Sequence, residues 1–133
     1  MSTLYDRIGG HETLETVVPR FYDRVLADDA LSGFFAGVNM QRQIGKQIDF
    51  LAAAMGGPLP YTGPSLKQAH RGRGIRLRHF TLVAEHLIAA FRDAGVSATE
   101  IDDIVALLAP LAADIASDAP KPVTGPLASA PAR

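Results

Sequence analysis

Apolar residues recur at helical spacing along almost the whole chain, and this periodicity limits the fold classes open to it. They follow one another at intervals of three and four, which is the pattern of a helix with one face in a core. No stretch of strand length alternates strictly between apolar and polar residues. At 133 residues the chain has room for one domain. The sequence therefore predicts an all-α fold, a single compact bundle of helices.

Turn and capping residues divide this pattern into segments. The predicted elements are a short helix over residues 3–8, a second helix with apolar residues from 14 to 26 on one side and an end near 28–29, a compact turn over 31–37, a third helix over about 40–55, a fourth with an apolar stripe over 80–91 that ends at Gly95, and a last helix that begins at Ser97 and carries apolar residues from 101 to 115. Proline lacks the amide donor and clashes with the preceding turn, so Pro19 should kink or restart the second helix and Pro110 should interrupt the last. Prolines among small residues from Ser117 onward are typical of a disordered tail, so we expect a folded part over 1–116 and a tail over 117–133.

Charge and composition argue against several classes of protein. The formal net charge is −1, and the only local basic cluster lies at residues 71–78, which favours a solvated face or a patch for a small anion over a nucleic-acid site. No apolar run approaches the ~20 residues that span a bilayer. The absence of cysteine excludes a thiolate zinc site. Since the N-terminus also lacks the pattern of a secretory signal, we expect a cytoplasmic protein without a membrane span and without a nucleic-acid partner.

His70 is the most informative single residue, because it precedes the glycine-rich stretch 71–75. The other histidines are scattered and form no close metal-ligand motif with it; we expect His11 at the start of the second helix and His79 and His86 at the surface or boundary of the fourth. One imidazole makes a poor site for a bare cation but a sufficient anchor for haem, whose porphyrin supplies four nitrogens. The alternative is a haem-free helical interaction module in which His70 is a surface histidine.

Three polar side chains fall on or beside apolar helix faces. Gln43 and Gln47 are four residues apart, and Gln47 lies between Ile44 and Leu51 on the apolar side of the third helix. They either touch water at the edge of that side or point into a polar-lined cavity and donate to a ligand. For Tyr22, on the second helix, the default interpretation is a structural tyrosine bonded to a backbone carbonyl.

Taken together, several segments resemble the truncated haemoglobins, in particular the group I branch of bacteria, protists and cyanobacteria. These segments are, in order, YDRIGG (5–10), FYDRVL (21–26), FF (34–35), GKQ (45–47), GGP with YTG (56–58 and 61–63), and HRGRGI (70–75) leading to HF (79–80). They cover about residues 3 to 116. The resemblance implies a truncated globin domain over 1–116, a two-over-two helical sandwich in which the second and third helices pack over the two long C-terminal ones around one haem b per chain.

The resemblance also assigns roles to residues. His70 becomes the proximal iron ligand; Phe35 packs on the porphyrin, Lys46 pairs with a haem propionate, Ile75 and Phe80 belong to the cofactor site, and Tyr22, Gln43 and Gln47 face the sixth coordination position. Group I relatives often have an apolar side chain where Gln43 stands, so a more polar pocket is expected here. Which of the two glutamines holds Tyr22 stays open.

The function that the resemblance implies is reversible, high-affinity binding of O2. Hydrogen-bond donors stabilise the partial negative charge on bound O2, whereas bound CO is less polar and gains less stabilisation from them. The resemblance further implies that the oxy form oxidises nitric oxide (NO) to nitrate, with an external reductase restoring the ferrous haem. The alternative is O2 storage, transport or gas sensing without catalytic turnover.

Overall fold

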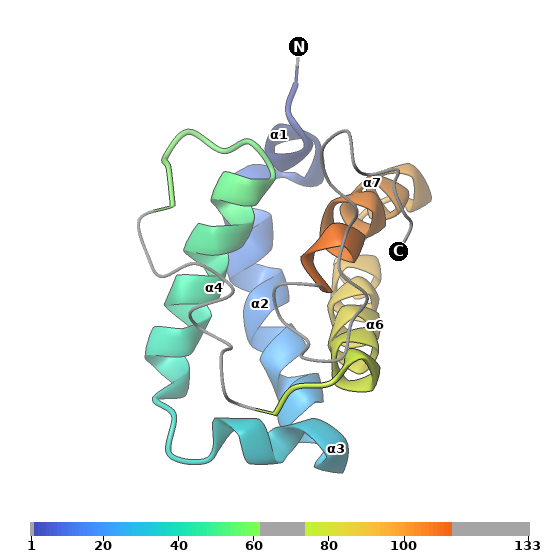
Figure 1. Ribbon diagram of the computed structural model, residues 1–133. Helices are drawn as coiled ribbons and strands as arrows, with labels where there is room; N and C mark the ends of the chain where they lie inside the picture. Colours follow the sequence, from blue (N-terminus) through green and yellow to red (C-terminus); the bar gives the residue numbers. More distant parts are fainter. Residues whose placement is uncertain (1, 62–73, 113–133) are drawn as a thin grey trace, which may run out of the picture.

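The computed structural model describes residues 2–61 and 74–112, and Figure 1 shows their arrangement. Their elements are α1 (Leu4–Ile8), α2 (Gly10–Leu26), α3 (Asp29–Ser32), the 3₁₀ turn η1 (Gly33–Phe35), α4 (Met40–Ala54), α6 (Leu77–Asp93), α7 (Ala98–Leu108) and the 3₁₀ turn η2 (Ala109–Leu111). All regular elements in these two ranges are helical, which confirms the predicted all-α class. The expectations for His70, residue 115 and the tail lie outside the described residues.

The helices form two packed pairs that share a core. α2 packs against both α4 and α6, and α7 packs against α6, while the short α1 contacts α2 and α7 (Figure 1). The largest fully buried side chains come from α2, α3, α4, α6 and α7: Leu14, Val17, Val18, Val25, Leu31, Leu51, Phe91 and Ile104. Among the described helices, none is long and apolar enough to cross a membrane.

The junction between α1 and α2 depends on glycine. Gly9 has φ 108° and Gly10 has φ 70°, a left-handed backbone that side chains disfavour. A Cβ on Gly9 would also lie 2.2 Å from Thr13 Oγ1. The double glycine therefore lets α1 end and α2 begin without an intervening loop.

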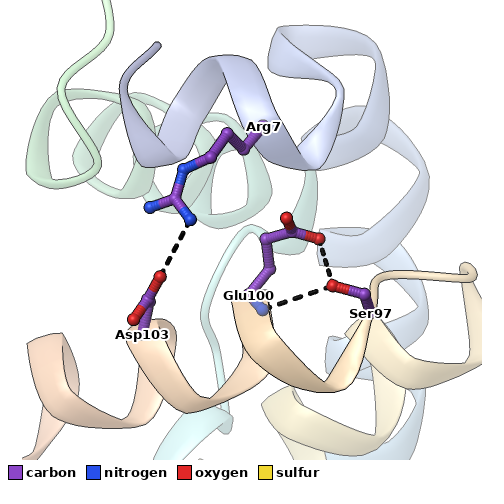
Figure 2. A network of polar contacts seen from close by, with 4 residues as sticks. All are labelled: Arg7, Ser97, Glu100 and Asp103. Carbon is purple, nitrogen blue, oxygen red and sulfur yellow. Dashed lines mark hydrogen bonds and ion pairs between the residues drawn. The ribbon is translucent and has the colours of Figure 1, made fainter. Parts of the chain in front are cut away.

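The start of α7 follows the predicted capping signal. The Ser97 hydroxyl accepts a hydrogen bond from the Glu100 backbone amide at 3.3 Å and donates to the Glu100 carboxylate (Figure 2). One turn further on, Asp103 pairs with Arg7 of α1 at 2.9 Å (Figure 2). Both side chains of this ion pair are well exposed, so it contributes at most about 1 kcal/mol.

Pro19 does not restart the second helix, because α2 runs as one helix from Gly10 to Leu26. The missing amide removes one hydrogen bond, but Val18 and Phe21 on either side of the proline are buried. Packing of both halves of α2 against the bundle therefore holds the helix through this position.

Pro110 does interrupt the last helix, since α7 ends at Leu108 and the chain continues as η2.

Two positions assigned to apolar faces prove exposed, Leu26 at 40% and Val105 at 41%. Leu26 is the last residue of α2 and follows the buried Val25, and Val105 follows the buried Ile104 on α7. Helical spacing alone does not define the width of a buried face.

Candidate functional site

The most distinctive polar cluster joins α2 and α4. Tyr22 is only 4% exposed, and its hydroxyl donates to Gln47 Oε1 at 3.4 Å. The same hydroxyl accepts a hydrogen bond from Gln43 Nε2 at 3.2 Å. The default interpretation of a tyrosine bonded to a backbone carbonyl is therefore wrong, and both glutamines hold Tyr22.

The position of the two glutamines follows from how α4 begins. The Asn39 side chain accepts from the Arg42 backbone amide and caps the helix at Met40. Residues four apart on a helix lie on the same side, so Gln43 and Gln47 lie one above the other where α4 packs on α2. Both side chains are half-buried and hydrogen-bond the buried Tyr22, so they lie at the edge of the apolar side but face α2.

Aromatic rings enclose the Tyr22 phenol. The Phe21 ring lies 4.7 Å away between centroids at a tilted angle of 56°, and the Phe35 ring lies edge-on at 5.6 Å and 76°. Burial raises the pKa of Tyr22 above its ordinary value of 10.0, while the hydrogen bond from Gln43 lowers it by less. Tyr22 is therefore a neutral phenol near neutral pH and keeps a proton to donate.

The structure corrects the expectation for His79, which is buried rather than at the surface or boundary, with 8% exposure. Its Nδ1 accepts a hydrogen bond from the Arg76 backbone amide at 2.9 Å, and its ring packs edge-on against Phe34 at 4.9 Å. The imidazole therefore caps the start of α6, a role that a polar side chain in the first turn of a helix can fill. The position of His79 in the first turn of α6 is the sequence feature that indicates such a cap, whereas the neighbouring apolar stripe does not.

The other two described histidines lie where the sequence placed them. His86 is at the boundary of α6, with Nε2 2.9 Å from Asp28 Oδ2. His11 is exposed in the first turn of α2, 3.4 Å from Glu15. No group of three or more acidic or imidazole side chains that could hold a metal ion occurs within residues 2–61 and 74–112.

The remaining candidate residues differ in their burial. Phe35 of η1, Ile75 and Phe80 are half-buried, and Lys46 is exposed on α4 next to Gln47. The structure thus brings Tyr22, Gln43, Gln47 and Phe35 into one contact cluster, and the roles of Lys46, Ile75 and Phe80 stay predictions.

Comparisons with known proteins identify the family. The bacterial-like globin family matches residues 3–117. A group 1 truncated haemoglobin, GlbN of Mycolicibacterium paratuberculosis, is 58% identical over 116 residues that cover 87% of this chain and 85% of that protein. The chain belongs to the group 1 truncated haemoglobins. Another member, GlbN of a Synechocystis species, is 39% identical and covers 80% of this chain and 90% of its own length.

Solved structures of truncated haemoglobins share the fold. The Fe(III) form from Tetrahymena pyriformis superposes with a TM-score of 0.83 at 32% identity, over 86% of this chain and 98% of that one. The 2/2 haemoglobin of a Synechococcus species, described in the cyanomet state with covalently attached haem, gives a TM-score of 0.77 at 32% identity over 80% and 90% of the two chains. These likenesses confirm the two-over-two architecture that the sequence resemblance implied.

Truncated haemoglobins are globin haem proteins, and the side chains described here fit that cofactor. Several apolar residues at core spacing on α4 and α6, among them Ile44, Phe80 and Val83, stay only half-buried on the two helices that flank α2. A large apolar ring system would cover such side chains. The neutral phenol of Tyr22 and its two amide partners are groups that can donate hydrogen bonds to a small polar ligand.

Proposed function

We propose that this truncated haemoglobin binds O2 reversibly and tightly at one haem b per chain and, when loaded with O2, oxidises NO to nitrate. The observation that carries the proposal is the cluster of the buried Tyr22 with the half-buried Gln43 and Gln47 where α2 packs on α4. We assign the function to a globin domain over residues 1–116, which the family match over residues 3–117 supports.

Haem, when bound, supplies the iron that takes the diatomic ligand and exchanges electrons with it. We propose that His70 would hold the iron and that Phe35, Ile75 and Phe80 would make apolar contacts with the ring. Lys46 suits a propionate, because its exposed ammonium is at the surface where a carboxylate would meet water.

Tyr22 is the proposed donor to the ligand. Its bond to Gln47 is at the long end of the hydrogen-bond range, so the hydroxyl proton can turn to a stronger acceptor at little cost. Because Gln43 donates to the same oxygen, it polarises the phenol and strengthens its donation. A hydrogen bond to a charged acceptor contributes roughly 1.5–3 kcal/mol, which corresponds to a ten- to a hundred-fold longer ligand lifetime.

The proposed partners are therefore O2 and NO, with CO as a ligand that gains less from the donors. Repeated oxidation of NO requires an electron donor, because each cycle leaves ferric haem, and we propose an external reductase. The alternative is O2 storage, transport or sensing without turnover, which uses the same Tyr22 cluster.

Stopped-flow mixing of the O2-loaded protein with NO, with and without a reductase and NADH, distinguishes NO oxidation from O2 binding without turnover. Fast conversion to ferric haem with stoichiometric nitrate, sustained over many turnovers, supports the dioxygenase. Slow conversion, or a single turnover that no tested reductant restores, favours O2 binding or sensing.

A further inference from the structure

One carboxylate, that of Asp28, joins three elements. It follows α2, and its Oδ1 accepts a hydrogen bond from the Ala30 backbone amide at 3.0 Å, which caps α3. Its Oδ2 lies 2.9 Å from His86 Nε2 on α6. The start of α3 is thereby tied to a helix 58 residues later in the chain.

The pair is sheltered from solvent and well defined. The side chains of His86 and Asp28 are 19% and 22% exposed. Within residues 2–61 and 74–112, buried His86 Nδ1 has no hydrogen-bond partner, and the bond from Nε2 to Asp28 is the hydrogen bond that the structure gives the ring. That bond is also the main reason that the pKa of Asp28 is lowered, which keeps the carboxylate charged and makes it a strong acceptor.

A second contact holds the same segment on α6. Phe34 of η1 packs edge-on against His79 at 4.9 Å. His79 and His86 are seven residues apart, which places them two turns apart on the same side of α6. The stretch of α3 and η1 is thus held near both ends by two histidines of α6, beside which α3 lies (Figure 1).

Phe35, the residue after Phe34, contacts Tyr22, the proposed donor to the ligand. Phe35 packs edge-on against the Tyr22 ring at 5.6 Å. α3 has four residues and η1 three, and helical pieces this short have little stability of their own, so tertiary contacts set their position. We infer that Asp28 and His86 are positioning residues for the distal pocket: they fix α3 and η1 on α6, and through Phe35 they set the Tyr22 phenol.

This inference rests on the proposed function of Tyr22 as the donor to O2. His86→Leu removes the bond to Asp28, whereas His86→Gln keeps an amide donor close to the position of Nε2. We expect His86→Leu to speed O2 dissociation by about 2- to 30-fold, the range of couplings through packed side chains, and to shift the infrared stretch of bound CO. His86→Gln should keep the rate of O2 dissociation within about twofold of the parent and leave the infrared stretch of bound CO close to that of the parent.

A readout independent of the diatomic ligand is amide hydrogen exchange in the haem-loaded protein. His86→Leu should speed exchange at Ala30, because its acceptor, the Asp28 carboxylate, is no longer anchored to α6. Asp28→Asn is a second variant in case His86→Leu fails to fold. It keeps an acceptor for the Ala30 cap but replaces the charged partner of His86, and it should speed O2 dissociation in the same direction.

His11→Leu is the matched control, because it removes the exposed histidine–carboxylate pair with Glu15 on α2 and should leave every readout unchanged. If Tyr22→Phe alters O2 dissociation while His86→Leu and Asp28→Asn do not, the positioning role is wrong and the proposed function stands. If His86→Gln behaves as His86→Leu, ring volume and not the bond is responsible, and the inference also fails. If Tyr22→Phe has no effect, the proposed distal role itself is wrong.

Discussion

At the scale of single residues, the Tyr22 cluster shows what a sequence can and cannot predict. Helical spacing placed Tyr22 near the core and placed Gln43 and Gln47 on one side of their helix. It did not show that they meet, because the meeting depends on how α4 is rotated and set against α2. The buried phenol with two amide partners is the feature on which the proposed ligand chemistry depends.

Tyr22→Phe should speed O2 dissociation ten- to a hundred-fold, because it removes a donor worth roughly 1.5–3 kcal/mol. CO dissociation should change much less, since CO is a weaker acceptor. Displacement of O2 by CO in a stopped-flow spectrophotometer measures the rate. Tyr5→Phe, on α1, is the matched control and should leave the rate unchanged; an equal rate in Tyr22→Phe would remove Tyr22 from the pocket.

The raised pKa of Tyr22 predicts a loss of stability at alkaline pH. In the unfolded chain this phenol loses its proton near its ordinary pKa of 10.0, whereas burial keeps it protonated to higher pH in the folded protein. Above about pH 10 the unfolded state therefore binds fewer protons, and the free energy of unfolding falls as pH rises toward the folded-state pKa. Urea unfolding of the haem-free protein from pH 8 to 11 should show the free energy of unfolding falling more steeply in the parent than in Tyr22→Phe. Parallel pH curves for the two proteins would contradict the raised pKa.

At the scale of elements, the sequence predicted helix ends better than helix continuity. Ser97 and the glycine pair at residues 9–10 mark real boundaries, because caps and positive φ angles are local requirements. Pro19 carried an equally strong local signal, yet α2 continues through it because tertiary packing outweighs one lost hydrogen bond. His79 was misplaced for a related reason: its burial depends on Phe34, which is far away in sequence.

Gly9→Ala should lower the free energy of unfolding by about 1–3 kcal/mol, since alanine is strained at φ 108°. Gly45→Ala is the comparison, because Gly45 lies inside α4, where an added Cβ would meet no atom of the described residues, and should gain about 0.5–1 kcal/mol. Urea denaturation of both variants gives the two values. A loss in Gly45→Ala as large as in Gly9→Ala would mean that the left-handed turn is not the cause.

At the scale of the whole molecule, the ordered set of motifs predicted the architecture that the structure and its relatives confirm. The packing of α2 against both α4 and α6 could not be derived from periodicity, which gives the faces of helices but not their neighbours. The proximal side remains a prediction, because His70 lies outside the described residues.

His70→Ala should abolish or greatly weaken haem retention, because one imidazole is the proposed protein ligand of the iron. Transfer of haem to an excess of apomyoglobin, followed by absorbance in the violet, measures retention. His11→Ala controls for loss of an exposed histidine and should retain haem as the parent does. Full retention in His70→Ala would refute the assignment.

The hydrogen bond between Tyr22 and Gln47 is the reference against which the proposed site would compare its ligands, because the phenol must leave the amide oxygen before it can donate to a ligand. In the proposed function, a ligand atom that accepts a hydrogen bond more strongly than an amide oxygen gains from this exchange, and a weaker acceptor does not. A shorter or longer bond between Tyr22 and Gln47 would therefore change the preference among diatomic ligands without altering the residues proposed to hold the haem.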